Sequence, residues 1–389
     1  MGAFLLKRTL HIFLILFLFV SLTYLLFQVT PGSVVDKFLG NPKMTPEIIA
    51  KIRAQFGLDD PWYVQYFRYL KNVFTGQLGI SYSQYPTPVW DILKDRIPRT
   101  LVLFLSSRVI SFYLGFILGK IIAWKRGSLI DTSTTAVGIT FWTMYYPLLA
   151  IVNIWLFGFL LGWFPINGFT NPLLWLNAPE GLTVNLIFAY MILTGFIFLI
   201  LWMIAWLIAK KPELSGKTKK RIIYISPLMV VIIAVLVWGF SGYGKYAWDI
   251  IYHMILPIFT LALISFGGTM LLTRDSMMET IQEDYVMAAR AKGLPPKLIR
   301  DKYAARTALL PVVTSLTLSL GFVLSGGVIT ESLFSWPGLG RTLLDAALMQ
   351  DVPLAIGAFA FTGVFVLIAH LVVDILYAVL DPRISIETI

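Results

Sequence analysis

The chain has 389 residues, of which 58% are hydrophobic and 13% charged, and its mean hydropathy is +0.79. A soluble domain usually carries about 25% charged residues. A chain of this length therefore has no interior large enough for its apolar side chains, and a bilayer is the solvent that suits them. The absence of cysteine excludes disulfides, Cys-ligated metals and thiol catalysis. The net charge of +10 lies mostly in loops between apolar runs, which favours cytoplasmic anchoring of membrane helices over binding of nucleic acid.

Eight apolar runs predict eight membrane spans, because a span needs about 20 residues. The first run, residues 9–29, follows Lys7 and Arg8 and is too long for the apolar region of a cleaved signal peptide. We therefore expect a retained anchor. The long third run is expected to be one tilted or broken helix with a bend at Pro147. The remaining runs are residues 101–123, 132–164, 184–209, 222–240, 251–272, 309–329 and 354–380.

The basic residues predict the orientation. Lys125 and Arg126, residues 210–221 and residues 274–306 are rich in Lys and Arg, which places these loops and both termini in the cytoplasm. Residues 31–98 then form an extracytoplasmic segment, in which Thr45-Pro46-Glu47 and Asp60-Pro61 each open a helix. The second of these helices should carry a face made of Trp62, Tyr66, Tyr69 and Leu70.

A short cytoplasmic helix is predicted over residues 284–293. Its alanines favour a helix, and Gly293 together with Pro295 ends it. Ala288 and Ala289 would form a surface without bulky side chains, against which another protein could pack closely. Charged side chains would surround that surface. An ordinary basic loop is the alternative interpretation. The candidate residues are Asp284, Tyr285, Ala288, Ala289, Arg290, Lys292 and Gly293.

This segment resembles the EAA loop of ABC importer permeases. Residues 288–293 read Ala-Ala-Arg-Ala-Lys-Gly and are followed by Ala308-Leu309-Leu310-Pro311, at the spacing of the oligopeptide, dipeptide and nickel branch. Met287 stands where the motif's glutamate would be. The chain thus resembles a permease subunit of the B type from end to end, except for one insertion. Other stretches that match this branch are residues 30–32, 58–61, 64–66, 76–79, 125–131, 331–341 and 374–383.

The resemblance implies an all-α type I permease fold in the plasma membrane of a prokaryotic cell. The helix at residues 284–293 would dock into a groove of an ATPase subunit. The implied partners are two ATPase subunits that use ATP and Mg²⁺, a related second permease, an extracytoplasmic substrate-binding protein and membrane lipids. No cofactor would bind this chain. The implied cargo is oligopeptides or dipeptides, with oligosaccharides, nickel or glutathione as alternatives.

The domain organisation departs from the family at one place. Residues 1–98 would form the first helix and extracytoplasmic segment, residues 99–383 the permease domain, and residues 384–389 a cytoplasmic tail. Family members usually have six spans, so the two spans within about residues 171–245 would be an inserted hairpin. It is expected to pack on the periphery, with an accessory-subunit or lipid-binding role as the alternative.

Two further sets of residues are candidates. Trp336, Pro337, Gly338 and Gly340 predict a tight outer turn that braces a gate, with the tryptophan at the membrane interface; contact with a substrate-binding protein is the alternative. Arg108 is a charge inside a span, which requires a cavity or a polar partner. The pathway would be lined by residues 251–272 and 309–329, where small-residue packing is the alternative role for the paired glycines. These glycines are Gly267, Gly268, Gly326 and Gly327.

Catalytic signatures are missing. Gly216-Lys217-Thr218 resembles part of a phosphate loop, but position 211 is lysine where the first glycine should be. His370 and Asp374 lie four apart and suggest a stabilising pair rather than a metal or proton site. We therefore expect no catalytic residue, no metal and no enzyme. A stand-alone secondary transporter would show inverted repeats, which we do not find, and a membrane-anchored signalling protein is the third hypothesis.

Overall fold

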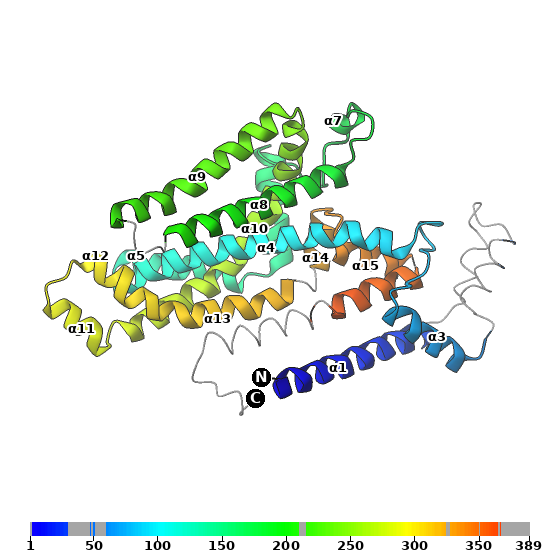
Figure 1. Ribbon diagram of the computed structural model, residues 1–389, viewed down its shortest axis with the longest axis horizontal. Coiled ribbons are helices and arrows are strands. Elements are labelled where there is room, and N and C mark those ends of the chain that lie inside the picture. Colours follow the sequence, from blue (N-terminus) through cyan, green and yellow to red (C-terminus); the bar gives the residue numbers. More distant parts are fainter. Residues whose placement is uncertain are drawn as a thin grey trace. The chain divides into compact units, whose positions relative to one another are not determined.

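The computed structural model describes residues 2–29, 47, 50, 60–209, 215–323, 327–349, 351–364 and 366 (Figure 1). Within these residues the chain forms helices and turns without a β-strand, apart from one isolated bridge between Ile80 and Pro88. The all-α class is confirmed. The chain divides into two compact units: Met1–Asn153 with Pro257–Ile389, and Ile154–Leu256.

Most helices belong to the first unit. They are α1 (Gly2–Val29), α3 (Trp62–Phe74), α4 (Val89–Trp124), α5 (Leu129–Thr143), α6 (Tyr146–Asn153), α11 (Asp284–Ala291), α12 (Pro296–Leu298), the π-helix η2 (Ile299–Ala304), α13 (Ala305–Val323), α14 (Val328–Leu333), α15 (Leu339–Leu348) and a helix at Val352–Val364. The second unit holds η1 (Ile154–Leu160), α7 (Pro172–Leu176), α8 (Val184–Ala209) and α9 (Gly216–Phe240). Helix α10 (Gly244–Thr280) begins in the second unit and ends in the first.

Three helices of the described part are long and apolar enough to cross a membrane, namely α4, α8 and α10. A fourth is added if α5 and the helix Tyr146–Leu160 form one broken span, bent by 105°. The expected bend is therefore present. The break falls at Met144 and Tyr145, which puts Pro147 in the first turn of α6, where its missing N–H is harmless. Shorter apolar helices cover Phe13–Leu25, Ile225–Phe240 and Val352–Val364, and the count of eight spans stays a prediction.

Helices α4 and α10 touch through their backbones. A Cβ added at Gly115 would lie 2.8 Å from the Phe266 carbonyl oxygen, and one at Gly119 would lie 2.5 Å from the Met270 carbonyl oxygen. Small residues four apart allow membrane helices to approach this closely. Ile122 continues the contact as part of a buried cluster with Phe266 and Met270. Residue numbers rise together along both helices, so the two helices run parallel.

Helix α5 packs against the same part of α10. A Cβ on Gly267 would overlap the Gly138 carbonyl, and one on Gly268 would lie 3.1 Å from Trp142 Nε1. The geometry of this glycine pair is that of close helix packing. The N-terminus of α5 is tied down as well, because Asp131 accepts hydrogen bonds from Arg274 Nε at 2.8 Å and from the Gly127 N–H at 3.1 Å.

The helix predicted after Asp60-Pro61 is α3, and it packs against α1. The hydroxyls of Ser21 and Tyr66 lie 2.6 Å apart, and the ring of Tyr24 stacks on that of Tyr69. Leu70 is buried, whereas Trp62 is 63% exposed and does not belong to the packed face. The helix expected at Thr45–Gly57 lies outside the described residues, apart from isolated positions.

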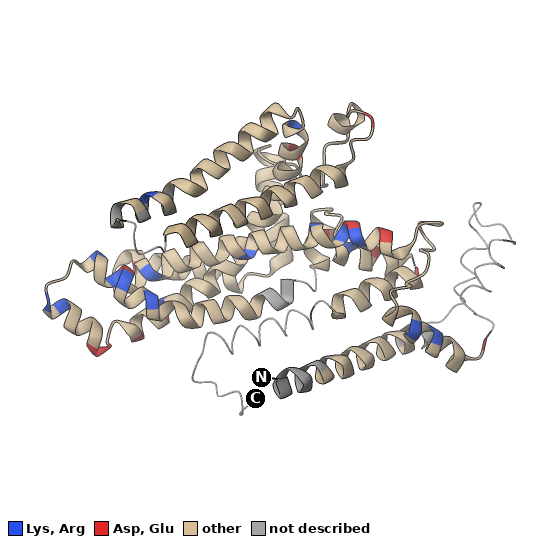
Figure 2. Cartoon of the chain, in the orientation of Figure 1, with Lys and Arg blue, Asp and Glu red and all other residues tan. Residues whose placement is uncertain are grey.

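In the second unit, α8 and α9 form the expected hairpin (Figure 1). The bounds of α8 match the predicted span, and none of its most apolar stretch is buried in protein. The indole N–H of Trp238 donates to Thr194 Oγ1 at 3.3 Å across the pair. Figure 2 shows that α8 carries no Lys, Arg, Asp or Glu along its length. A helix that is apolar all round suits lipid.

Because α4 and α10 are in such close contact, we predict that one added methyl group at this contact lowers the stability of the protein. Gly119→Ala should lower the free energy of unfolding by about 1–3 kcal/mol, because the methyl group meets backbone that has no room to move. Gly195→Ala in α8 is the matched control: no atom lies within 4 Å of its added Cβ, so the change should be neutral or slightly stabilising. Thermal unfolding of the detergent-solubilised protein measures both, and equal midpoints for the two variants would contradict the packing.

Candidate functional site

The short helix α11 is anchored on one face. Val286 and Ala289 are 0% and 3% exposed and lie in a buried cluster that joins α11 to the neighbouring ends of α4, α10, η2 and α13. Ala289 therefore does not contribute to an exposed surface, contrary to expectation, because it points into this cluster. The other buried members of the cluster are Ala123, Met277, Ile299, Ala304, Ala305 and Ala308.

The opposite face of α11 is exposed. Ala288 lies there without a large side chain, beside Met287, which is 51% exposed. Tyr285 is held in place, since its hydroxyl donates to Thr307 Oγ1 at 2.9 Å. Gly293 has a φ of +71°, a conformation that glycine adopts without strain and that turns the chain out of the helix. The remaining exposed candidates are Asp284, Arg290 and Lys292.

An ion-pair network fixes the segment that follows α11. Asp301 in η2 accepts from Lys120 of α4 at 3.0 Å and from Arg300 at 2.9 Å. The hydrogen bond from Arg300 is the main reason that the pKa of Asp301 falls to about 2. The carboxylate is therefore ionised at physiological pH, and the ion pair between α4 and η2 does not depend on pH in that range.

A groove of about 560 Å³ opens beside α11. Ala123, Met278 and Ile281, at the ends of α4 and α10 and just beyond, supply apolar walls. Arg126 and Arg290 stand among its lining residues, and the Arg290 guanidinium lies 5.5 Å from the Trp124 ring centre. Sequence reasoning missed this groove, because its walls come from segments more than a hundred residues apart.

The turn motif formed by Trp336, Pro337, Gly338 and Gly340 is largely buried in protein. Trp336 is 0% exposed, and its indole N–H donates to the Arg99 carbonyl oxygen at 3.2 Å. The ring is therefore enclosed by protein and not exposed to lipid, and its depth relative to the membrane interface stays a prediction. The Pro337 carbonyl oxygen accepts from the Arg96 guanidinium at 3.2 Å. Gly340 has no room for a side chain, because a Cβ would lie 2.8 Å from the Val328 nitrogen.

A buried carboxyl group organises this turn. Glu331 is 0% exposed and accepts from the Thr100 hydroxyl at 2.7 Å and from the Arg341 N–H at 2.8 Å. The same Thr100 oxygen accepts from the Leu339 N–H at 2.7 Å. Gly338 must be glycine, because a Cβ there would overlap both the Glu331 carboxyl and Thr100. Glu331 was not among the predicted residues, although an acidic residue next to an apolar span was a usable signal.

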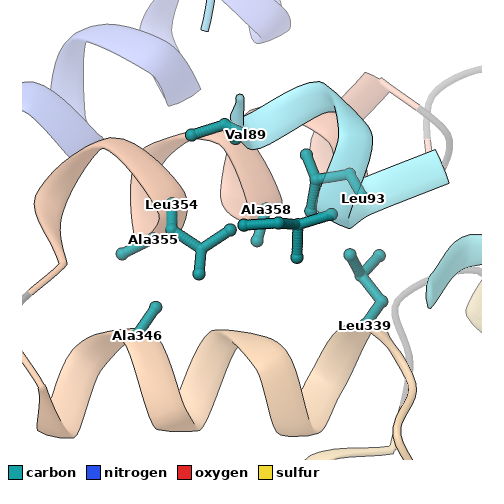
Figure 3. Close-up of a cluster of buried hydrophobic side chains, with 8 residues drawn as sticks. Val89, Leu93, Leu339, Ala346, Leu354, Ala355 and Ala358 are labelled. Atoms are coloured by element: carbon teal, nitrogen blue, oxygen red, sulfur yellow. The ribbon is translucent and has the colours of Figure 1, made fainter. Parts of the chain in front are cut away.

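An apolar cluster supports the turn (Figure 3). It joins the first turns of α4 to α15 and to the helix Val352–Val364. The side chains that point toward one another in Figure 3 are Val89, Leu93, Leu339, Ala346, Leu354, Ala355 and Ala358. The motif is thus held by its neighbours in the chain and by the N-terminal turns of α4.

The remaining predicted residues are dispersed. Arg108 donates to Ser265 Oγ on α10 at 3.4 Å and has no acidic partner among the described residues. Gly327 adjoins the ring of Phe104, which a Cβ would overlap. Gly326, His370 and Asp374 lie outside the described residues. Within the described part, no group of three His, Cys, Asp or Glu side chains could hold a metal ion.

The buried Glu331 predicts a measurable pH dependence. Burial, partly opposed by its hydrogen bonds, raises its pKa to about 7, above the value of about 4.3 in an unfolded chain. Between these values the folded protein retains a proton that the unfolded chain has lost, so the free energy of unfolding falls as the pH rises and levels off above about 7. Glu331→Gln should remove this component. The control Asp345→Asn, at a half-exposed carboxylate, should follow the wild type.

Thermal midpoints from about pH 5 to about pH 8 test this prediction. The wild type should lose stability relative to Glu331→Gln as the pH rises. Parallel profiles for these two proteins would show that Glu331 does not titrate as its burial requires.

Comparison with known proteins agrees with the resemblance described from the sequence. The family described as binding-protein-dependent transport system inner membrane component matches residues 221–386, and the N-terminal part of such membrane components matches residues 1–104. The chain is 31% identical to the dipeptide transport system permease protein DppB of Escherichia coli K12, over 93% of each chain.

Two further relatives show how much of the chain the similarity covers. The chain is 32% identical to the di/tripeptide transport system permease protein DppB of Pseudomonas aeruginosa, over 93% of each chain. It is 29% identical to the oligopeptide transport system permease protein AppB of Bacillus subtilis, over 99% of this chain and 100% of that protein. With similarity over nearly its whole length, the chain belongs to the inner membrane components of binding-protein-dependent transport systems, the permease subunits of ABC importers.

Proposed function

We propose that this chain forms one half of a peptide translocation pathway and is driven by separate ATPase subunits that dock on α11. The observation that carries this proposal is the division of α11 into two faces. Val286 and Ala289 anchor one face of α11 in the protein. The other face is exposed, and Ala288 places no bulky side chain on it. A helix of this kind can be gripped by a partner and can transmit the partner's movement.

The anchoring cluster supports transmission to the spanning helices. It contains Ala123 from α4, Met277 from α10 and Ala308 from α13. A packed interior deforms little, so a push on α11 moves the ends of these three helices together. The parallel contact of α4 and α10 at Gly115 and Gly119 would carry the movement toward the outer side.

The proposed partners are the other subunits that a permease subunit of an ABC importer needs for transport. Its family is a transport component and not an enzyme, so two ATPase subunits would supply ATP hydrolysis with Mg²⁺. A related second permease would complete the pathway, and an extracytoplasmic binding protein would deliver the substrate. The proposed orientation places both termini and α11 in the cytoplasm, in agreement with the basic loops.

Peptides are the proposed cargo because the relatives are named as dipeptide, di/tripeptide and oligopeptide permeases. Arg108 provides a physical reason within the chain. Its guanidinium lies within a spanning helix, and its partner among the described residues is the neutral hydroxyl of Ser265. A guanidinium binds a carboxylate through paired hydrogen bonds, and every linear peptide with a free C-terminus carries a carboxylate whatever its sequence.

Other cargoes and another mechanism are distinguished by experiment. The ligand retained by the binding protein that works with this permease separates peptides from oligosaccharides, nickel and glutathione. Transport by the purified chain in an ion gradient, without any ATPase, would instead indicate a secondary transporter.

The docking proposal predicts that bulk on the exposed face of α11 uncouples the transporter. Ala288→Trp should abolish copurification with the ATPase subunits, or abolish the stimulation of ATP hydrolysis by loaded binding protein. Ala347→Trp is the matched control, because Ala347 is also an exposed helical alanine but lies on α15. The docking assignment fails if Ala288→Trp assembles and couples like the control.

The pathway proposal predicts a charge requirement at Arg108. Arg108→Gln should reduce peptide uptake at least tenfold, since a charge-assisted pair contributes about 1.5–3 kcal/mol. Arg108→Lys should retain part of the uptake, because it keeps the charge and loses the paired geometry. Uptake of labelled dipeptide into proteoliposomes holding the whole transporter measures both variants, and wild-type uptake by Arg108→Gln would remove Arg108 from the pathway.

A further inference from the structure

The groove beside α11 combines apolar walls with unpaired positive charge. Its volume of about 560 Å³ is within the range of small-molecule sites. Ala123 and Trp124 close the end of α4, while Met278 belongs to the last turn of α10 and Ile281 follows it directly. Since α4 and α10 are long and apolar enough to cross a membrane, this groove lies where spanning helices leave the bilayer.

The positive charges of the groove are not neutralised by ion pairs. Two nearby basic groups do have acidic partners: Lys120 contacts Asp301 at 3.0 Å, and Arg274 contacts Asp131 at 2.8 Å. In contrast, neither Arg126 nor Arg290 has a carboxylate within ion-pair distance among the described residues. The lining contains no acidic residue, and Gln282 is the other polar side chain there. The groove is therefore electropositive and ready for an anion.

One of the two cations is already oriented. The Arg290 guanidinium lies 5.5 Å from the centre of the Trp124 ring, a distance at which the ring face attracts it. Among the described residues the Arg290 guanidinium donates no hydrogen bond, so its N–H groups remain available to an anion. Binding of an anion between Arg126 and Arg290 would therefore cost little free energy for ordering the Arg290 side chain.

We propose that this groove binds the headgroup of an anionic phospholipid from the cytoplasmic leaflet, with the phosphate between Arg126 and Arg290. The start of an acyl chain would lie against Met278 and Ile281. The combination of a phosphate site with an apolar wall at the end of two spans fits a lipid better than a soluble anion, which has no use for the apolar wall. The proposal rests on the proposed orientation, in which this end of α4 faces the cytoplasm.

The competing occupant is an acidic side chain of the docked ATPase, because Arg290 belongs to α11. Arg126 distinguishes the lipid from an acidic side chain of the ATPase, because Arg126 follows α4 and is not part of the docking helix α11. The lipid should therefore remain bound when the ATPases are removed. An acidic protein side chain would leave the groove together with its subunit.

The test uses the whole transporter, reconstituted in nanodiscs with equal amounts of phosphatidylglycerol and phosphatidylcholine. After mild detergent extraction, native mass spectrometry counts the lipids that stay bound. The wild type should be enriched in phosphatidylglycerol. Arg126→Gln should lower that enrichment about fivefold, the effect of about one lost contact between a basic residue and an anionic lipid. Lys125→Gln, at an exposed neighbour that does not line the groove, should match the wild type.

Each other outcome overturns the lipid site. Undiminished enrichment in Arg126→Gln would exclude Arg126, and equal loss in Lys125→Gln would indicate general surface charge. Retained lipid together with lost ATPases in Arg126→Gln would assign the groove to the protein interface. The Ala288→Trp variant keeps this test separate from the docking proposal: lipid enrichment should persist in it, whether or not the ATPases are released.

Discussion

The direct contact between the backbones of α4 and α10 is the constraint on which the rest of the first unit depends. Gly115 and Gly119 bring the helices so close that a single methyl group has no place between them. Because this contact sets the register of two long helices, it also sets what their ends can reach. The N-terminal part of α4 reaches the turn around Glu331, and its C-terminal end reaches the cluster that anchors α11.

The two ends of α4 are held by different chemistry. Toward the N-terminal end, Thr100 and the buried Glu331 share hydrogen bonds with the backbone of the turn, in a setting that excludes water and strengthens each bond. Toward the C-terminal end, Lys120 and Asp301 form an ion pair that stays partly exposed, and exposed pairs contribute little energy on their own. The N-terminal part of α4 is therefore held mainly by buried hydrogen bonds, whereas its C-terminal end depends mainly on its apolar cluster.

Arg108 and the pair Arg126 with Arg290 share one physical property. Each is a cation that lies near the bilayer or within a span and has no acidic partner among the described residues. A protein that leaves a charge in such a place bears a desolvation cost that a partner can relieve. We propose different anions for the two places, a passing peptide and a resident lipid, because Arg108 is within α4, whereas Arg126 follows α4 and Arg290 belongs to α11.

By itself the sequence determined the membrane class, the family, the bounds of α8 and the existence of α11. These features follow from local properties: the length of an apolar run, the order of short motifs, and a helix end at Gly293 and Pro295. Only the tertiary structure decided that Ala289 and Trp336 are buried, that Glu331 meets Thr100, and that a groove opens beside Arg126. The reason is that burial and pairing depend on which distant segment lies against a side chain, and the local pattern of residues does not contain that information.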